Sequence, residues 1–295
     1  MHLIDLMRHA YLLLRRLVIV AVSCFTIVVV FNIHIHRTEP DPAPPDPEFY
    51  RQTEVGHRAA IALEDLTQLH LNADTSISVN ETPQTRKVVL KKGEVLVSIQ
   101  HDNARPFEII VNHAVLADLG TALNVDTHDG VTNVAVIDGR IRVFEQQDNG
   151  ERLDPLVETP DGYQRRPVYL EVGDISRLEE LGDGSVLFHA ESRGLAEAKA
   201  RTSWLRGELN VTTERLDEVV AEFNRYHPER LIIADADIAK MRALPGHYSL
   251  ADLQAFLGSL QQLGLRADPL PRTHAAARPQ EYLVKRNSAI RRNLR

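Results

Sequence analysis

One long apolar run near the start of the chain constrains its organisation more than any other feature. Residues 17–33 read LVIVAVSCFTIVVVFNI and contain no charged side chain. As a helix this run would be about 26 Å long, close to the ~30 Å hydrocarbon thickness of a bilayer. Arg8, Arg15 and Arg16 precede it. Because basic residues stay on the cytoplasmic side, the pattern predicts a transmembrane helix at 17–35, a cytoplasmic N-terminus at 1–16 and the rest of the chain across the membrane.

A cleaved signal peptide is the alternative interpretation of this run. Such a peptide needs a short apolar core followed by a small-residue cleavage site. Here the run is longer, no A-x-A pattern follows it, and apolar residues continue beyond Cys24. The sequence therefore favours an uncleaved anchor.

Composition and motifs point away from catalysis. Cys24 is the only cysteine, so no intramolecular disulfide and no cysteine-based zinc site is expected. The net charge of -7 gives no indication of nucleic-acid binding. The sequence has no glycine-rich phosphate loop, no H-E-x-x-H and no G-x-S-x-G. Asp235 and Asp237 are interpreted as turn and cap residues. We therefore expect no enzyme activity, no metal and no cofactor.

A proline-rich linker at 36–53 precedes a predicted β domain at 54–190, whose core motifs span 54–145. Apolar residues alternate with polar ones there, which is typical of strands with one buried face. The alternating residues are Ile77, Val79, Val95, Val97, Ile99, Phe107, Ile109, Val111, Ile141 and Val143. Lys92-Gly93, Asp129-Gly130 and Asp138-Gly139 are predicted turns between strands. Val168, Leu170 and Val172 predict one or two further strands.

A second pattern begins after a predicted linker at 191–203 and defines a small βα module at 204–286. Leu216, Val219, Val220 and Phe223 form a helical stripe that Thr213 can cap, and a second stripe starts at a capping box over 249–252. The predicted order is β-α-β-β-α-β-β. Residues 287–295 are a basic tail. The whole chain is thus predicted to be membrane-anchored α+β, with one transmembrane helix, an all-β domain and a βα module.

Four motifs in the β domain resemble the periplasmic domain of FecR-type transmembrane regulators. They are RKVVLKKGEV at 86–95, HDNARPFEI at 101–109, LGTALNV at 119–125 and VAVIDGRIRV at 134–143. Further on, WLRGEL at 204–209, EFNRY at 222–226 and Ile238-Ala239 resemble the C-terminal part of that family. That part is similar to the short N-terminal domain of secretins and TonB-dependent receptors.

The resemblance implies a signal transducer in the bacterial inner membrane, single-pass, with a cytoplasmic N-terminus and its bulk in the periplasm. Such a protein relays the occupancy of a TonB-dependent receptor for siderophores or haem to an extracytoplasmic-function sigma factor. The implied partners are the periplasmic signalling domain of the receptor, the sigma factor and the lipid bilayer, with no nucleic acid. Family members usually have a larger cytoplasmic domain, whereas only residues 1–16 precede the span here. A separate cytoplasmic partner, a truncation or a different start site would each account for that.

The candidate site residues follow from the same motifs. Trp204, Asn224, Arg225 and Tyr226 are the candidate partner interface, although Trp204 is equally suited to covering the apolar face of the small sheet. The motif residues expected to be structural are Gly93, Glu94, Arg105, Pro106, Phe107, Gly120, Thr121 and Gly139. The alternative function is a cell-envelope scaffold without sigma-factor control.

Overall fold

The computed structural model describes residues 48–287, except 103, 119, 129, 193 and 272–278. Pro47–Arg295 forms one compact unit. The predicted transmembrane helix at 17–35 and the cytoplasmic segment at 1–16 lie outside the described residues, as does most of the proline-rich linker.

The predicted fold class, membrane-anchored α+β, is wrong. The described residues form 21 strands and four short α-helices, the longest of which has 11 residues. Of these helices, none combines the length and the apolar composition that crossing a bilayer requires. The described residues are mostly β because the large sheet alone contributes 16 strands, whereas the helices of the module are few and short.

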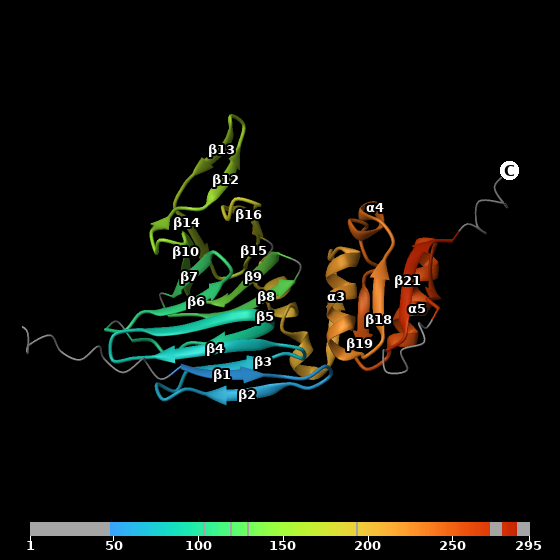
Figure 1. The fold of residues 1–295 in the computed structure, drawn as a ribbon, viewed down its shortest axis with the longest axis horizontal. Helices are drawn as coiled ribbons and strands as arrows, with labels where there is room; N and C mark the ends of the chain where they lie inside the picture. Colours follow the sequence, from blue (N-terminus) through green and yellow to red (C-terminus); the bar gives the residue numbers. More distant parts are fainter. Residues whose placement is uncertain are drawn as a thin grey trace, which may run out of the picture. The chain divides into compact units, whose positions relative to one another are not determined.

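One sheet of 16 strands makes up the larger part of the described chain (Figure 1). Its strands are β1 (Glu48–Gln52), β2 (Ala59–Ala62), β3 (Gln68–Leu71), β4 (Ser76–Glu81), β5 (Arg86–Ser98), β6 (Phe107–Val111), β7 (Ala114–Asp118), β8 (Ala122–His128), β9 (Val131–Asp138), β10 (Arg140–Gln146), β11 (Arg152–Leu153), β12 (Leu156–Thr159), β13 (Gly162–Arg165), β14 (Val168–Glu171), β15 (Asp174–Glu180) and β16 (Val186–Ser192). The first half of β5 pairs with β4 and β6, and its second half pairs with β3 and β8. The sheet therefore folds back around one apolar core as a nearly closed barrel.

Gly93 allows β5 to pass from one half of the sheet to the other. Its φ is +93°, and a Cβ atom there would lie 2.6 Å from the Cα atom of Thr75. The prediction of a turn at Lys92-Gly93 is wrong, because the chain bends at this glycine without leaving the strand. Asp138-Gly139 does turn, between β9 and β10, as predicted.

The alternating residues fill the core as predicted. The following are each at most 1% exposed: Ile77, Val79, Val95, Val97, Phe107, Ile109, Val111, Ile141 and Val143. Val168 and Leu170 of β14 join the same core, whereas Val172 is 46% exposed and follows the strand. Period-two alternation therefore identified the buried face of the sheet.

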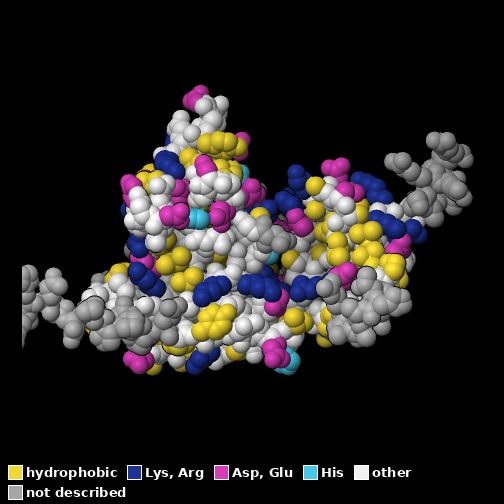
Figure 2. Space-filling view, viewed as in Figure 1, with side chains coloured by type: hydrophobic (Ala, Val, Ile, Leu, Met, Phe, Trp, Pro, Cys, Tyr) yellow, Lys and Arg dark blue, Asp and Glu magenta, His cyan; other side chains and the backbone are white. Residues whose placement is uncertain are grey.

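The hairpin of β12 and β13 projects from the sheet (Figure 1). All four residues of β13 are exposed, so its sequence has no alternation by which to recognise a strand. Over β4 and β5, a row of Lys and Arg side chains crosses the surface (Figure 2). On β5, the Lys91 amine lies 5.0 Å from the ring centroid of Tyr50.

The βα module has its own core and follows α2 (Leu195–Ala200) and the 3₁₀ turn η1 (Ser203–Arg206). Its elements are β17 (Glu208–Val211), α3 (Leu216–Tyr226), β18 (Arg230–Ile233), α4 (Ala236–Ala239), β19 (Gly246–Ser249), α5 (Leu253–Leu260), η2 (Gln261–Leu263), β20 (Leu265–Pro269) and β21 (Glu281–Arg286). Apart from α4 and the one-turn η2, this is the predicted order. Strand β17 pairs with β19, and β18, β21 and β20 form a second sheet. The predicted domain limits stay a prediction.

The helix stripes of the module are buried as predicted. Phe223 of α3 stacks on Phe256 of α5 with ring centroids 4.2 Å apart. The predicted cap at Thr213 is wrong: Arg215 is the N-cap of α3, and its backbone N–H donates to the Glu218 carboxylate at 2.9 Å. Asp235 caps α4, as its interpretation as a cap residue predicted.

Candidate functional site

A buried cluster of polar side chains joins the β domain to the module. Helix α3 supplies Arg225, whose side chain is 6% exposed and lies against β5 and β8. The Arg225 Nη1 atom is 2.6 Å from the Glu222 carboxylate on its own helix and 3.1 Å from the Glu94 carboxylate on β5. Its Nη2 atom pairs with Asp126 on β8. We call these residues, with the amides described next, the Arg225 cluster.

Two asparagines complete the hydrogen bonds of the buried carboxylates. Asn72, which follows β3, donates to Glu94 at 2.6 Å and to Glu222 at 2.9 Å. Asn124 of β8 donates to the other Glu94 oxygen at 2.7 Å. The Tyr226 hydroxyl donates to the Asn72 side-chain oxygen. Each of these buried polar groups has a hydrogen-bond partner, so the cluster stabilises the contact between the β domain and the module.

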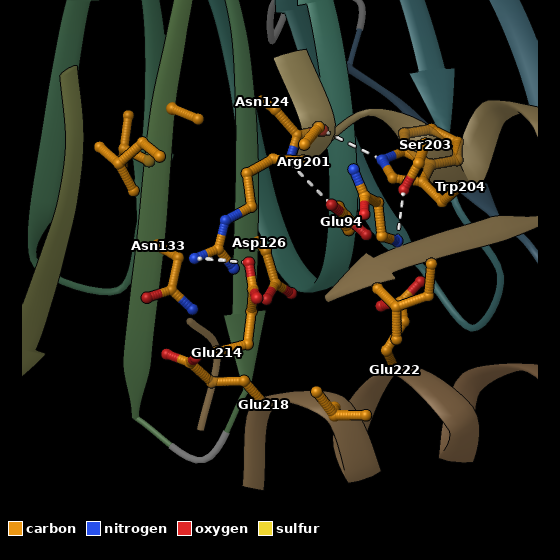
Figure 3. Close-up of a pocket in the computed structure, with 17 residues that line it drawn as sticks. Glu94, Asn124, Asp126, Asn133, Arg201, Ser203, Trp204, Glu214, Glu218 and Glu222 are labelled. Carbon is orange, nitrogen blue, oxygen red and sulfur yellow. Dashed lines mark hydrogen bonds and ion pairs between the residues drawn. The ribbon is translucent and has the colours of Figure 1, made fainter. Parts of the chain in front are cut away.

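Trp204 lies next to the Arg225 cluster, in the 3₁₀ turn η1 of the segment that connects the β domain to the module. It is 2% exposed, and its indole N–H donates to the Asn124 side-chain oxygen at 3.2 Å (Figure 3). The Trp204 carbonyl accepts a hydrogen bond from the guanidinium of Arg58, a residue that directly precedes β2. The indole therefore fixes the connecting segment to β8 and leaves little of its surface for solvent.

The electrostatics of the cluster are unbalanced, because three carboxylates surround one guanidinium. Burial, with the negative charges of Glu222 and Asp126, raises the pKa of Glu94 well above its usual range. Burial likewise raises the pKa of Glu222. Burial would also raise the pKa of Asp126, but Arg225 and His128 together hold that pKa below its usual range. Burial and the neighbouring carboxylates therefore favour the protonated form of both glutamates.

A small cavity of about 50 Å³ adjoins the cluster. Figure 3 shows Glu94, Trp204 and Glu222 around it, with Arg201 paired to Glu214 at 3.3 Å. A cavity of this size has room for water and not for a substrate. Within the described residues, no group of three or more His, Cys, Asp or Glu is placed to hold a metal ion. The arrangement is suited to holding two parts of the chain together.

The four candidate interface residues lie in η1 (Trp204) and in the last turn of α3 (Asn224, Arg225 and Tyr226). Asn224 does not belong to the Arg225 cluster. The Asn224 amide instead bonds the backbone of β18: it donates to the Leu231 carbonyl at 3.0 Å and accepts from the Leu231 N–H at 2.8 Å. Trp204, Arg225 and Tyr226 thus make intramolecular contacts with the β domain. Asn224 instead bonds to the edge of β18. Their role toward a partner stays a prediction.

The motif residues from 93 to 107 have identifiable contacts. Glu94 belongs to the Arg225 cluster, next to the bend at Gly93. Arg105 pairs with Asp102 at 2.9 Å, and its carbonyl accepts two bonds from the buried Arg86 guanidinium. The Pro106 carbonyl accepts from the Arg86 N–H at 3.2 Å, and the Phe107 ring lies beneath that guanidinium.

The motif glycines from 120 to 139 allow two backbone segments to meet. A Cβ atom on Gly139 would collide with the Gly120 carbonyl and would lie 2.8 Å from the methyl group of Thr121. Thr121 itself is 4% exposed, and its carbonyl accepts from the Ile99 N–H at 2.9 Å. These contacts place the two glycines at a junction between the strands that flank them.

Sequence reasoning missed Asn72, Asn124, Asp126 and Glu222. Only Glu222 had a detectable signal, because a Glu three residues before an Arg on a helix can pair with it. The other partners are 99 to 154 residues away from α3 along the chain. Their contacts depend on how the two parts of the chain dock.

Comparison with known proteins identifies the sheet domain. Residues 51–142 match the model of the family described as FecR protein, which confirms the resemblance over those residues. No curated protein matches the sequence. Two crystal structures of a candidate anti-sigma factor from Parabacteroides distasonis ATCC 8503, at 1.65 and 2.50 Å resolution, have a similar fold. Both are 19% identical in sequence to this chain, with TM-scores of 0.61 and 0.59. The matched regions cover 81% and 80% of this chain and 100% and 98% of the two crystallised chains.

Proposed function

We propose that this chain, whose residues 51–142 form a FecR domain, takes part in the control of an extracytoplasmic-function sigma factor. The FecR match carries this proposal. The candidate anti-sigma factor whose fold extends over 81% of the chain supports it. The described residues act by binding, with no chemistry of their own, and the Arg225 cluster ties the FecR domain to the module that would receive the signal.

The finer proposal is that the module binds the periplasmic signalling domain of a TonB-dependent receptor for iron uptake. A partner can add a strand to an open sheet edge, with main-chain hydrogen bonds giving affinity. In the three-stranded sheet β18-β21-β20, the Asn224 side chain occupies the edge of β18 at Leu231. Strand β20 pairs only with β21 among the described strands. It is therefore the edge we propose for the partner.

The hydrogen bonds at the ends of β20 indicate which groups face this edge. Leu270 N–H donates to Glu281, and Asn287 N–H donates to Gly264, so the even-numbered residues of β20 bond to β21. Because antiparallel bonding alternates, the N–H and carbonyl of Ala267 point to the open edge. Location in the periplasm at a bacterial inner membrane remains part of the proposal and depends on the apolar run at 17–33.

The test compares two substitutions of Ala267 in cells that carry a reporter for the sigma factor. Ala267→Pro removes the outward N–H from an edge where proline is otherwise tolerated, whereas Ala267→Val keeps it. We expect receptor-triggered induction to fall at least fivefold with the proline and to change less than twofold with the valine. Calorimetry with the receptor's signalling domain should give the same order of affinities.

Two results would count against these proposals separately. Equal induction by the two Ala267 variants would contradict strand addition at β20. If removing the whole chain changes the output of no extracytoplasmic-function sigma factor in the genome, sigma-factor control is wrong. The cell-envelope scaffold would then be the better account.

A further inference from the structure

A groove of about 420 Å³ runs between the FecR domain and the module, on the side of β9 and β15. Strands β9, β15 and β16 form one wall, and the segments before α3 and after α4 form the other. Its volume is within the ~300–1,000 Å³ of pockets that hold small ligands. It is separate from β20, where we place the receptor.

The lining of this groove is basic although the chain is acidic. Five Arg or Lys side chains and two Glu side chains line it, while the whole chain has a net charge of -7. Arg177 of β15 is satisfied within the wall, since it pairs with Glu179 at 2.8 Å and with Glu218 at 3.3 Å. Arg215 likewise pairs with Asp217. Lys240 and Arg242, on the same wall as Arg215, differ from it.

Lys240 and Arg242 are the cations of the groove without a carboxylate partner. Both are exposed, and among the described residues neither has an acidic side chain within ion-pair distance. The Arg242 guanidinium donates to the carbonyl of Thr213, which orients the side chain and leaves its charge uncompensated. Two such cations, two residues apart on one wall, present positive charge to the same space.

We propose that this groove binds a small anion with several carboxylate or phosphate groups. Lys240 would supply a mobile point charge, and Arg242 would supply planar N–H donors suited to either group. The ligand would contact the module and the FecR domain at once. A ligand that binds only this docked form stabilises it by mass action. The groove would then let a solute set how firmly the two parts are joined.

The test is calorimetric titration of the purified full chain with two probes, citrate for the carboxylate class and tripolyphosphate for the phosphate class. We expect one saturable site for at least one probe, with affinity that falls as salt rises. Lys240→Glu should weaken it at least tenfold, and Arg242→Gln, which keeps a donor for the Thr213 carbonyl, should weaken it several-fold. Lys91→Glu makes the same charge change on β5, outside the groove, and should change the affinity less than twofold.

The outcomes separate the possibilities. Binding of one probe alone identifies the chemical class. The absence of saturable binding for both probes would overturn the proposal, as would equal weakening by Lys240→Glu and Lys91→Glu. Hexaglutamate serves as a third probe, for acidic peptides. If it binds in a Lys240-dependent manner while citrate and tripolyphosphate do not, the proposal is overturned in favour of an acidic peptide. Unchanged Trp204 fluorescence in each variant shows that the two parts remain docked. The titration needs neither receptor nor sigma factor, so its failure is distinct from failure of the proposed function.

Discussion

At the scale of single residues, Arg225 is the one cation that pairs with all three carboxylates of its cluster. Replacing it with Met leaves the buried Glu94 and Glu222 and the partly buried Asp126 without their cation, and breaking a buried pair from one side typically costs about 3–5 kcal/mol. We expect Arg225→Met to lower the free energy of unfolding by that amount in urea denaturation. Arg166→Met, an exposed arginine next to the projecting hairpin, is the control. An unchanged midpoint for Arg225→Met would show that the cluster does not hold the module.

The raised pKa values of the glutamates predict how stability depends on pH. Burial and neighbouring carboxylates raise the pKa of Glu94 above that of the unfolded chain, so the folded state binds the proton more tightly. The resulting stabilisation is fully present below about pH 4.5 and is lost as the pH rises through the folded pKa. We therefore expect Glu94→Gln to flatten the decline in urea midpoint between pH 5 and pH 8. Parallel profiles for variant and wild type would contradict this.

Phe107 tests the strand register that the sequence predicted. It is 1% exposed in the core, under the guanidinium of Arg86. Phe107→Ala should cost ~3–5 kcal/mol because it removes a large buried side chain and leaves a cavity. Tyr163→Ala, at a position 59% exposed on β13, should cost less than about 1 kcal/mol by the same urea measurement.

At the scale of elements, the bend of β5 at Gly93 shapes the sheet. Gly93 and Gly150 both have positive φ, at +93° and +83°, but of the two only Gly93 would bring an added Cβ atom against backbone, that of Thr75 just before β4. Gly150→Ala should cost about 1 kcal/mol for its conformation alone. Gly93→Ala should cost at least ~2 kcal/mol more, as measured by thermal or urea unfolding. Similar losses for the two variants would mean that the strands can move apart at the bend.

The same elements show how much of the fold the sequence could predict. The alternation around Val95 and Phe107 and the stripe of α3 are local patterns, and they identified strands and helices that the structure contains. Strand β13 has no alternation because all of its residues are exposed. Lys92-Gly93 predicts a turn because a glycine signals positive φ, and this signal does not reveal whether strand pairing continues on both sides. The predicted fold class is wrong for a related reason, since exposed strands such as β13 have no pattern that reveals them.

The candidate site was less predictable than the fold. Glu94 and Arg225 were singled out separately from motifs, but their contact joins residues 131 positions apart. No periodicity in either segment indicates the other. Such a contact follows from the docking of two surfaces, which is a property of the whole molecule.

At that scale, the question is whether the β domain and the module unfold together. Trp204 is the only tryptophan of the chain and lies at their junction, so its fluorescence reports docking, while far-ultraviolet circular dichroism reports mainly the sheet. Because the Arg225 cluster is buried between the two cores, we expect coincident urea transitions in the wild type, as one cooperative unit requires. In Arg225→Met, the fluorescence transition should come at lower urea than the circular dichroism transition. Arg166→Met should keep the two coincident. Separate transitions already present in the wild type would mean that the module docks too weakly for the cluster to transmit anything between the two parts.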